Sequence, residues 1–352
     1  MIGIGVLGTG RVVLNRYVEV FRDELKGARV IMVCDKVRER ADEVAGLLGA
    51  KAVYEKEQMF ESSEIDAILI ATESGKHFKH SYEVLAAGKH VIVEKPPSLF
   101  PQEILDAEQF AKERGLMYAV VFQNRLNPAM RILKKTFEEG LFGKLVLGTI
   151  RLRWCRYQDY YEDGWHGTWK MDGGVINQQA IHHIDALQWV CGPITLVNAL
   201  QSNALNRLEA EDTTVATVKF ENGAIGIVEA TTAARPDDFE ASMSIVGEKG
   251  MAVIGGIALN KIDTWHFVKE RPEDKTIPVE YSQEVPTGYG LSHGPLLQEI
   301  VNRLKMGRTD PMITGNDTVP TVQLVHALYQ SAEIGGWVRM VDNPLSERLG
   351  KD

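Results

Sequence analysis

The segment Ile2-Gly3-Ile4-Gly5-Val6-Leu7-Gly8-Thr9-Gly10-Arg11-Val12-Val13 decides the fold of this chain. Residues 2–7 form an apolar run, residues 8–10 a glycine-containing turn, and residues 12–25 an amphipathic pattern typical of a helix. Strand, glycine turn and helix in this order are typical of the first part of a doubly wound parallel sheet. The helix amino terminus at such a turn attracts phosphate groups. We therefore expect an α/β domain that binds a phosphate-bearing ligand.

A second glycine pattern overlaps the turn at residues 8–10 and is not expected to bind phosphate. The literal pattern G-x-G-x-x-G occupies residues 3–8, which form the predicted strand, whereas a phosphate turn must follow a strand. In the turn that does follow, one glycine permits a tight bend and the next lets a pyrophosphate approach the backbone. Val13 replaces the third glycine, which speaks against close packing of the helix on the strand. The predicted cofactor contacts of this turn are Gly8, Thr9, Gly10, Arg11 and Val12.

Asp35, directly after the second predicted strand, indicates which dinucleotide binds. A carboxylate here accepts hydrogen bonds from the adenosine ribose and repels a 2′-phosphate, which favours NAD over NADP. Lys36 and Arg38 would suit that phosphate, so NADP remains the alternative. A helix cap is the competing explanation for Asp35. The glycine turn beside it favours dinucleotide binding.

The alternation of elements predicts two domains. Strands are expected at residues 2–7, 29–34, 67–70, 90–93 and 117–122, and helices at residues 12–25, 37–48, 78–87 and 101–114. This order predicts a parallel sheet. After a helix at residues 128–139, β-like runs follow at residues 145–154, 196–199, 213–220, 224–230 and 241–246, and a last helix at residues 319–334. We expect an α/β chain with a Rossmann domain, residues 1–124, and an α+β domain with an open, largely antiparallel sheet, residues 125–352, that binds substrate and forms oligomers.

The composition excludes several classes of protein. The 352 residues carry a formal net charge of -9, which argues against a nucleic-acid or anionic-membrane partner. The first residues lack the basic flank and apolar core of a signal peptide, and no apolar stretch reaches the ~20 residues that span a bilayer. The three cysteines lie far apart in apolar or aromatic surroundings, as free thiols of a reducing compartment do. We expect a cytoplasmic protein.

The tripeptide Glu94-Lys95-Pro96 closes the apolar run of residues 90–93. Open α/β sheets bind ligands beyond the carboxyl ends of their strands. A lysine at this point is therefore expected to meet a substrate hydroxyl beside the cofactor.

A second group of polar residues lies on the glycine-rich start of a helix, residues 172–189. At about 100° per residue, Gln178, His182, Asp185 and Trp189 share one face of that helix. His182 is a candidate general acid/base because imidazole titrates near neutral pH. Asp185 is expected to orient it or to bind a substrate hydroxyl, and a solvated face is the competing explanation.

The histidine pairs do not predict a metal site. His182 and His183 point in different directions on a helix, and His77 and His80 have no cysteine or acidic cluster beside them. We therefore expect no structural or catalytic metal.

Together these residues resemble the glucose–fructose oxidoreductase/inositol dehydrogenase (Gfo/Idh/MocA) family. The matching positions are Gly8-Thr9-Gly10, Asp35, residues 72–77, Glu94-Lys95-Pro96, Gln123-Asn124-Arg125, Gly173-Gly174 and His182-x-x-Asp185. The resemblance implies a catalytic pair, Lys95 and His182. It also implies further cofactor contacts, which are Thr72, His77, Glu94, Lys95, Gln123 and Asn124. Members of the family form homodimers or homotetramers through the open sheet.

Within the family the chain looks like the nucleotide-sugar branch. Gln178 stands where inositol-type members carry an aspartate, and residues 165–170 and 288–294 look like that branch, although His166 stands where arginine is expected. The resemblance implies NAD-dependent oxidation of a secondary hydroxyl, at C3, of a nucleotide sugar such as UDP-N-acetylglucosaminuronate, in surface-polysaccharide synthesis. The expected substrate contacts are Lys95, Arg153, Trp165, Lys170, Asn177, Gln178, His182, Asp185 and Tyr289. Arg153 or Lys170 would face a carboxylate or phosphate.

In this hypothesis His182 takes the hydroxyl proton while the Lys95 ammonium stabilises the developing alkoxide. Because burial lowers the pKa of a lysine, two alternatives stay open: Lys95 and His182 share these roles, or they exchange them. The alternatives are a dehydrogenase of free polyols or aldoses, a deoxysugar ketoreductase, and a non-enzymatic protein that senses a dinucleotide. A sensor needs neither Lys95 nor His182, which speaks against the last.

Overall fold

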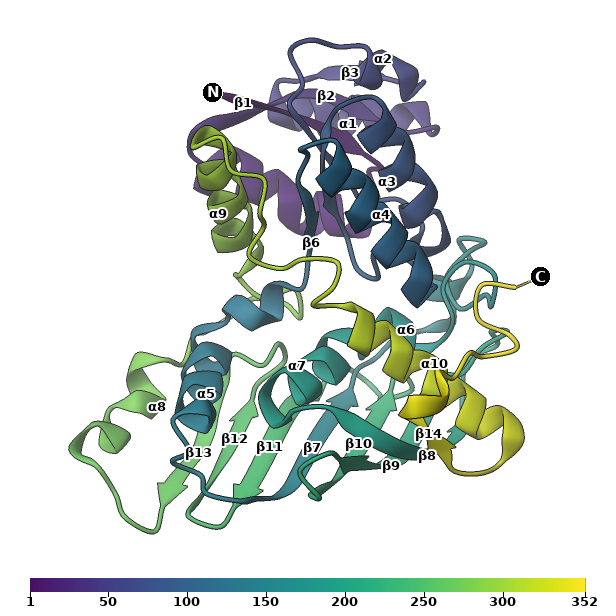
Figure 1. The fold of residues 1–352 in the computed structure, drawn as a ribbon. Coiled ribbons are helices and arrows are strands. Elements are labelled where there is room, and N and C mark those ends of the chain that lie inside the picture. Colours follow the sequence, from purple (N-terminus) through teal and green to yellow (C-terminus); the bar gives the residue numbers. More distant parts are fainter. Residues whose placement is uncertain (352) are drawn as a thin grey trace. The chain divides into compact units, whose positions relative to one another are not determined.

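The computed structural model describes residues 1–351 and divides into two compact units. The first unit is Met1–Gln123 with Leu291–Val319, and the second is Asn124–Gly290 with the chain from Pro320 onward (Figure 1). Among the described residues, no helix combines the length and apolar character that a membrane crossing requires.

The first unit contains a six-stranded sheet in the order β3-β2-β1-β4-β5-β6, with every neighbouring pair parallel. Its strands are β1 (Ile2–Leu7), β2 (Ala28–Cys34), β3 (Lys51–Val53), β4 (Ala67–Ile70), β5 (His90–Val93) and β6 (Tyr118–Val120). This order is that of a dinucleotide-binding Rossmann fold, and it confirms the predicted fold class. The sequence analysis missed β3, because three residues are too short to display a period.

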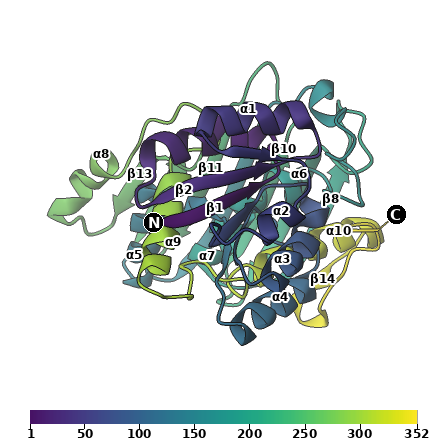
Figure 2. The same ribbon diagram turned by 90° about the horizontal axis from the view of Figure 1, so that it is seen from above.

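Helices pack around this sheet (Figure 2). They are α1 (Arg38–Leu48), α2 (Glu57–Phe60), α3 (His77–Ala86), α4 (Pro101–Glu113) and α9 (His293–Lys305). The first predicted helix is present but contains two π-helical stretches, Val13–Tyr17 and Val20–Glu24. The π winding begins at the fully buried Val13, so the helix leaves α geometry where the sequence lacks the third glycine.

Residues Leu291–Val319 return to the first unit, whereas the predicted division at residue 124 placed them in the second. Helix α9 packs on β1 and on the second π-helical stretch. Beyond it, the Val120 N–H donates to the Ile313 carbonyl at 3.2 Å. A return of the chain over this distance leaves no sign in strand and helix periodicity, which reports only local structure.

The second unit contains an eight-stranded sheet in the order β13-β12-β11-β7-β10-β9-β8-β14. Its strands are β7 (Leu145–Arg153), β8 (Ile194–Ser202), β9 (Thr213–Phe220), β10 (Ile225–Thr231), β11 (Glu240–Gly247), β12 (Gly250–Gly255), β13 (Lys261–Phe267) and β14 (Val338–Arg339). Only the pair β7–β10 is parallel, which confirms a largely antiparallel sheet. The predicted hairpin turn joins β9 to β10, with Gly223 at φ +87°.

One face of this sheet is covered by helices and the other is open (Figure 1). The helices of the unit are α5 (Pro128–Glu138), α6 (Val175–Gln178), α7 (Ile181–Cys191), α8 (Ile277–Glu280) and α10 (Val319–Ile334). In β7, Gly148 faces α7, because a Cβ there would lie 3.1 Å from the Cys191 sulfur. The alternate residues Arg151 and Arg153 therefore lie on the open face. The sequence analysis missed β12, β13, β14 and α8 in this unit, and α2 and α9 in the first unit.

The contact that holds the returning segment gives a first prediction. The buried Glu108 carboxylate of α4 accepts the Asn316 main-chain N–H at 2.5 Å and its side-chain amide at 3.0 Å. Glu108→Ala leaves these donors without their acceptor, so we expect the free energy of unfolding to fall by about 1–3 kcal/mol. Chemical denaturation followed by circular dichroism measures this. Glu113→Ala, exposed on the same helix, is the control, and equal losses in both variants would contradict the assignment.

Candidate active site

The parallel register of the first unit brings the ends of its strands to one edge. Leu7 is paired with Cys34 and with Ile70, Ile70 with Val93, and Val93 with Val120. The residues that follow these strands therefore lie at the same edge of the sheet. The strand order reverses beside β1 and β4, and this switch point is where such sheets bind ligands.

The glycine turn after β1 is shaped to admit a ligand. Gly8 has φ +93°, and a Cβ there would lie 2.5 Å from the Ala71 carbonyl oxygen, so only glycine fits. Gly10 differs, because a Cβ there would meet no atom within 4 Å. The fold itself does not require glycine at residue 10. An open cradle at a helix amino terminus fits the pyrophosphate of a dinucleotide.

Asp35 is held directly against this turn. Its Oδ2 accepts the Thr9 main-chain N–H at 2.8 Å and the Thr9 hydroxyl at 2.7 Å, while Oδ1 accepts the Val37 N–H at 2.9 Å. The cap-like contact to Val37 and a ribose contact are therefore compatible, because a carboxylate has about four acceptor positions. Arg38, a candidate for a 2′-phosphate, lies over the Tyr54 ring at 4.2 Å.

His77 braces the loops that follow β4 and β5. Its Nδ1 lies 2.7 Å from the Pro96 carbonyl oxygen and its Nε2 lies 3.0 Å from the Thr72 carbonyl oxygen. The Thr72 hydroxyl lies 2.9 Å from His80 Nδ1. Burial lowers the pKa of His77, and it lowers the pKa of His80 to about 4. His77 thus positions main chain at the edge of the sheet, and His80 positions the Thr72 side chain.

Glu94 is the residue at the end of β5 that is predicted to line the dinucleotide site. Its side chain is buried, Oε1 accepts the Tyr17 hydroxyl at 2.6 Å, and Oε2 accepts the Lys95 N–H at 3.1 Å. The carboxylate therefore points into the unit. Lys95 itself remains partly exposed at the strand end.

Gln123, the last residue of the amino-terminal segment of the first unit, lies just beyond β6. Its side chain is 3% exposed, and its Oε1 is buried without a hydrogen-bond partner within the described residues. A buried amide oxygen without a donor fits a ligand that supplies one, such as a nicotinamide carboxamide. The neighbouring Asn124 is also buried and begins the second unit.

In the second unit, the glycine-rich segment leads into two helices, α6 and α7, rather than the single helix predicted. The Gly174 N–H donates to the Tyr329 hydroxyl at 2.7 Å, and the Ile176 N–H donates to Glu211 Oε1 at 3.1 Å. A Cβ on Gly174 would lie 2.2 Å from the Glu211 carbonyl oxygen. Burial raises the pKa of Glu211 to about 8. The glycines thus serve close packing around a buried carboxyl group.

The polar face of α7 is covered mainly by protein. Asp185 is buried and forms a two-point ion pair with Arg125, at 2.8 and 2.6 Å, and accepts the Thr321 hydroxyl at 2.9 Å. A buried carboxylate requires partners, and neighbouring elements supply them to Asp185, whose contact with a ligand stays a prediction. His182, one turn earlier, remains partly exposed. The buried His183 packs edge-on against Trp154 at 6.1 Å.

Near the start of α7, rings and amides form a chain that the sequence analysis did not detect. The Tyr160 hydroxyl accepts the side-chain amides of Gln178 and Gln179, each at 3.0 Å. The His166 ring lies 4.6 Å from the Tyr160 ring, and Trp165 stacks on His166 at 3.6 Å. Stacked rings with amide groups beside them suit the flat faces and hydroxyls of sugars and bases.

The remaining predicted substrate contacts have different surroundings. The Arg153 guanidinium pairs with Glu229 at 2.6 Å and Glu240 at 3.2 Å on the open face of the sheet, and its contact with the substrate stays a prediction. Asn177 is fully buried, and its amide donates to the Asp172 carbonyl at 2.6 Å. Lys170 is exposed. Tyr289 follows Gly288, and a Cβ added at Gly288 would lie 2.9 Å from the Trp154 ring.

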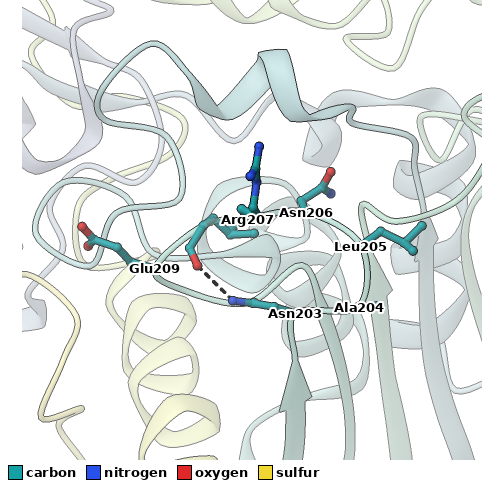
Figure 3. Close-up of a pocket in the computed structure, with 7 residues that line it drawn as sticks. Asn203, Ala204, Leu205, Asn206, Arg207 and Glu209 are labelled. Carbon is teal, nitrogen blue, oxygen red and sulfur yellow. Dashed lines mark hydrogen bonds between the residues drawn. The ribbon is translucent and has the colours of Figure 1, made fainter.

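A surface hollow lies elsewhere in this unit (Figure 3). It is lined by residues 203–209, which include none of the predicted site residues. The main-chain N–H groups of Ala204, Leu205 and Asn206 all donate to the Asp212 carboxylate. These N–H donors therefore stabilise the loop itself and are already hydrogen-bonded within it. Among residues 1–351, no group of three or more His, Cys, Asp or Glu side chains is arranged to hold a metal ion.

The first unit thus has the fold and the edge chemistry of a nicotinamide-dependent oxidoreductase. Residues 2–122 match the oxidoreductase family with an NAD-binding Rossmann fold, and residues 130–253 match the GFO/IDH/MocA C-terminal domain. The chain belongs to the Gfo/Idh/MocA family and is an NAD-dependent dehydrogenase that acts on CH–OH groups.

Solved structures and curated relatives agree with this family. The WlbA dehydrogenase from Bordetella pertussis, in complex with NADH and UDP-GlcNAcA, is 33% identical, with a TM-score of 0.90 over 96% of this chain and 97% of that one. The corresponding WlbA from Chromobacterium violaceum is 30% identical, with a TM-score of 0.87 over 96% and 95%. The scyllo-inositol 2-dehydrogenase (NAD(+)) of Bacillus subtilis is 28% identical over 71% of this chain and 72% of its own.

The buried Glu211 generates a pH prediction. Its pKa of about 8 lies above the ordinary 4.5, so the folded state retains a proton that the unfolded chain has released across this interval. Stability should therefore fall as pH rises from 5 to 8, by up to about 1.4 kcal/mol per pH unit from this group. Glu211→Gln cannot ionise and should lose this part of the slope. Denaturation at several pH values measures it, with the exposed Glu209→Gln as control; parallel curves for wild type and Glu211→Gln would refute it.

Proposed function

We propose that the chain oxidises a secondary hydroxyl, at C3, of a nucleotide sugar such as UDP-N-acetylglucosaminuronate, in surface-polysaccharide synthesis. The observation that carries this proposal is the similarity to the two WlbA dehydrogenases over nearly the whole chain. Their complexes hold NADH and UDP-GlcNAcA. The presence of both Lys95 and His182 supports a catalyst rather than a dinucleotide sensor.

In this mechanism two residues act on the substrate hydroxyl. When bound, NAD would supply the acceptor for the hydride that leaves the carbon carrying the hydroxyl. A ring nitrogen of His182 takes the hydroxyl proton, and partial exposure leaves that ring accessible to a substrate. The Lys95 ammonium, at the end of β5, stabilises the alkoxide charge that develops. The Gly8-Thr9-Gly10 turn, Asp35 and Gln123 would hold the cofactor, through its pyrophosphate, ribose and carboxamide respectively.

For the sugar and its nucleotide, we propose the ring chain of Tyr160, His166 and Trp165 as the recognition surface. Gln178 lies beside it through its bond to Tyr160. Lys170, which is exposed, and Arg153 remain the two cations that we propose for a carboxylate or phosphate. Tyr289 remains a proposed substrate contact.

Substrate choice separates this proposal from its competitor. The inositol dehydrogenase relative favours a free polyol or aldose as the second candidate. We expect NADH formation with UDP-N-acetylglucosaminuronate and NAD, and far slower formation with inositol or simple aldoses. Fast turnover of a free polyol alone would replace the nucleotide-sugar assignment.

The role of Lys95 predicts a separation of turnover from binding. Lys95→Ala removes the ammonium that stabilises the alkoxide, so we expect kcat to fall by about 10²–10⁴-fold while the Kd for NADH changes little. Absorbance at the NADH band and NADH fluorescence measure the two quantities. Lys51→Ala, at an exposed lysine of the same unit, should leave both unchanged. Near-normal turnover of Lys95→Ala would sink the assignment.

We also propose that the open face of the eight-stranded sheet joins copies of the chain into a homodimer or homotetramer. Apolar side chains on this face are exposed to an extent unusual for a monomer, which are Leu200 at 74%, Val215 at 49%, Ile225 at 60% and Ile227 at 38%. The open face also carries a compensated charge cluster, in which Arg153 pairs with Glu229 and Glu240. A mixed apolar and paired-charge surface suits self-association.

This face predicts how the oligomer dissociates. Ile227→Asp places an unpaired charge in the centre of the proposed interface, so we expect a smaller assembly in light scattering coupled to size exclusion. Val268→Asp changes an equally apolar residue that is 85% exposed and lies beyond β13, and it should leave the mass unchanged. An unchanged mass for Ile227→Asp would remove this face as the interface.

A further inference from the structure

A buried polar cluster lies directly behind Lys95 in the first unit. Tyr17, Glu94 and His293 are 0%, 6% and 2% exposed. The Tyr17 hydroxyl donates to Glu94 Oε1 at 2.6 Å, His293 Nε2 lies 4.0 Å from the same oxygen, and the Tyr17 and His293 rings meet edge to face at 5.3 Å. Tyr17 and His293, from two distant parts of the sequence, thus both approach the Glu94 carboxylate.

The segment that brings His293 to this cluster is held by a specific contact. Arg16 forms a two-point ion pair with Glu24, at 2.5 and 3.0 Å, and donates to the Leu291 carbonyl at 3.0 Å. The Glu24 carboxylate occupies the space beside Gly294, where a Cβ would lie 1.9 Å from its oxygen. The start of α9 is therefore held against Tyr17 and Glu94 with little freedom.

The cluster acts on Lys95 through both bonding and charge. Glu94 Oε2 accepts the Lys95 N–H at 3.1 Å, which fixes the main chain from which the lysine side chain projects. Burial raises the pKa of Glu94, and the Lys95 charge beside it opposes that rise. Burial lowers the pKa of His293 to about 3, and the charges of Arg16 and Lys95 act in the same direction. Electrostatic interaction is reciprocal, so a Glu94 carboxylate favours the protonated lysine. The charged groups that face His293 are Arg16, Lys95 and the Glu94 carboxylate, whose Oε1 lies 4.0 Å from His293 Nε2.

We propose that Tyr17, Glu94 and His293 form a positioning cluster for Lys95. The Tyr17 hydroxyl orients the Glu94 carboxylate, His293 closes over it from the returning helix, and Glu94 fixes the Lys95 main chain and keeps the Lys95 side chain protonated. None of the three touches the substrate in this role. The inference rests on the proposed function, in which Lys95 meets the substrate hydroxyl.

The first test reads the state of Lys95 without any sugar. Competitive acetylation over a pH series, followed by peptide mass spectrometry, reports the pH midpoint at which Lys95 becomes reactive. Glu94→Gln removes the negative charge and should lower this midpoint by about one pH unit or more. Tyr17→Phe removes one hydrogen bond to the carboxylate and should move the midpoint in the same direction by less. An unchanged midpoint in both variants overturns the cluster.

The second test compares binding with turnover in the same proteins. We expect Glu94→Gln to lower kcat at least tenfold and to displace its pH profile, while the NADH Kd stays within about threefold, because the buried carboxylate is bonded to the Tyr17 hydroxyl and to the Lys95 main chain. Tyr118→Phe removes a buried hydroxyl from the neighbouring strand β6 and is the matched control for Tyr17→Phe. A loss of NADH affinity that matches the loss of turnover would return Glu94 to the cofactor site and reject the cluster. Should every sugar fail as a substrate, the labelling test still decides the cluster independently.

Discussion

The common level at which the parallel strands end is the constraint on which the rest of the structure depends. Register pairs the last residues of β1, β4, β5 and β6, so every chain segment that leaves these strands emerges at one edge. The glycine turn, Thr72, Lys95 and Gln123 are side by side for this reason alone. A slip of one residue in β5 would turn Lys95 to the other face of the sheet and separate it from the others.

In both units, buried carboxyl groups bind side chains and main chain that are distant in the sequence. Burial of a charge is costly unless donors surround it, so each buried carboxyl recruits groups from distant segments. Glu94 recruits Tyr17, Glu108 recruits Asn316, and Asp185 recruits Arg125. These contacts order the main chain around the functional residues.

Much of the first unit could be predicted from sequence because its determinants are local. The strand β1, the turn at Gly8, and the position of Asp35 after β2 follow from period and spacing, and the structure contains them. Identifying the glycine turn required a choice between the literal G-x-G-x-x-G pattern, which lies inside a strand, and the turn that follows that strand. Chain order resolved it. The side-chain environments of Glu94 and Asp185 could not be obtained in this way, because their partners lie up to 77 and 136 residues away.

The sequence by itself determined the class of fold, the glycine turn after β1, and the presence of Lys95 and His182 at the ends of recognisable elements. These features depend on residue type and on separations of a few residues. Only the tertiary structure decided that Leu291–Val319 returns to the first unit, that Arg153 lies on the open face, and that Glu94 points inward. The physical reason is that burial and partners are properties of neighbours in space, and strand or helix periodicity specifies which face a residue occupies without specifying what covers that face.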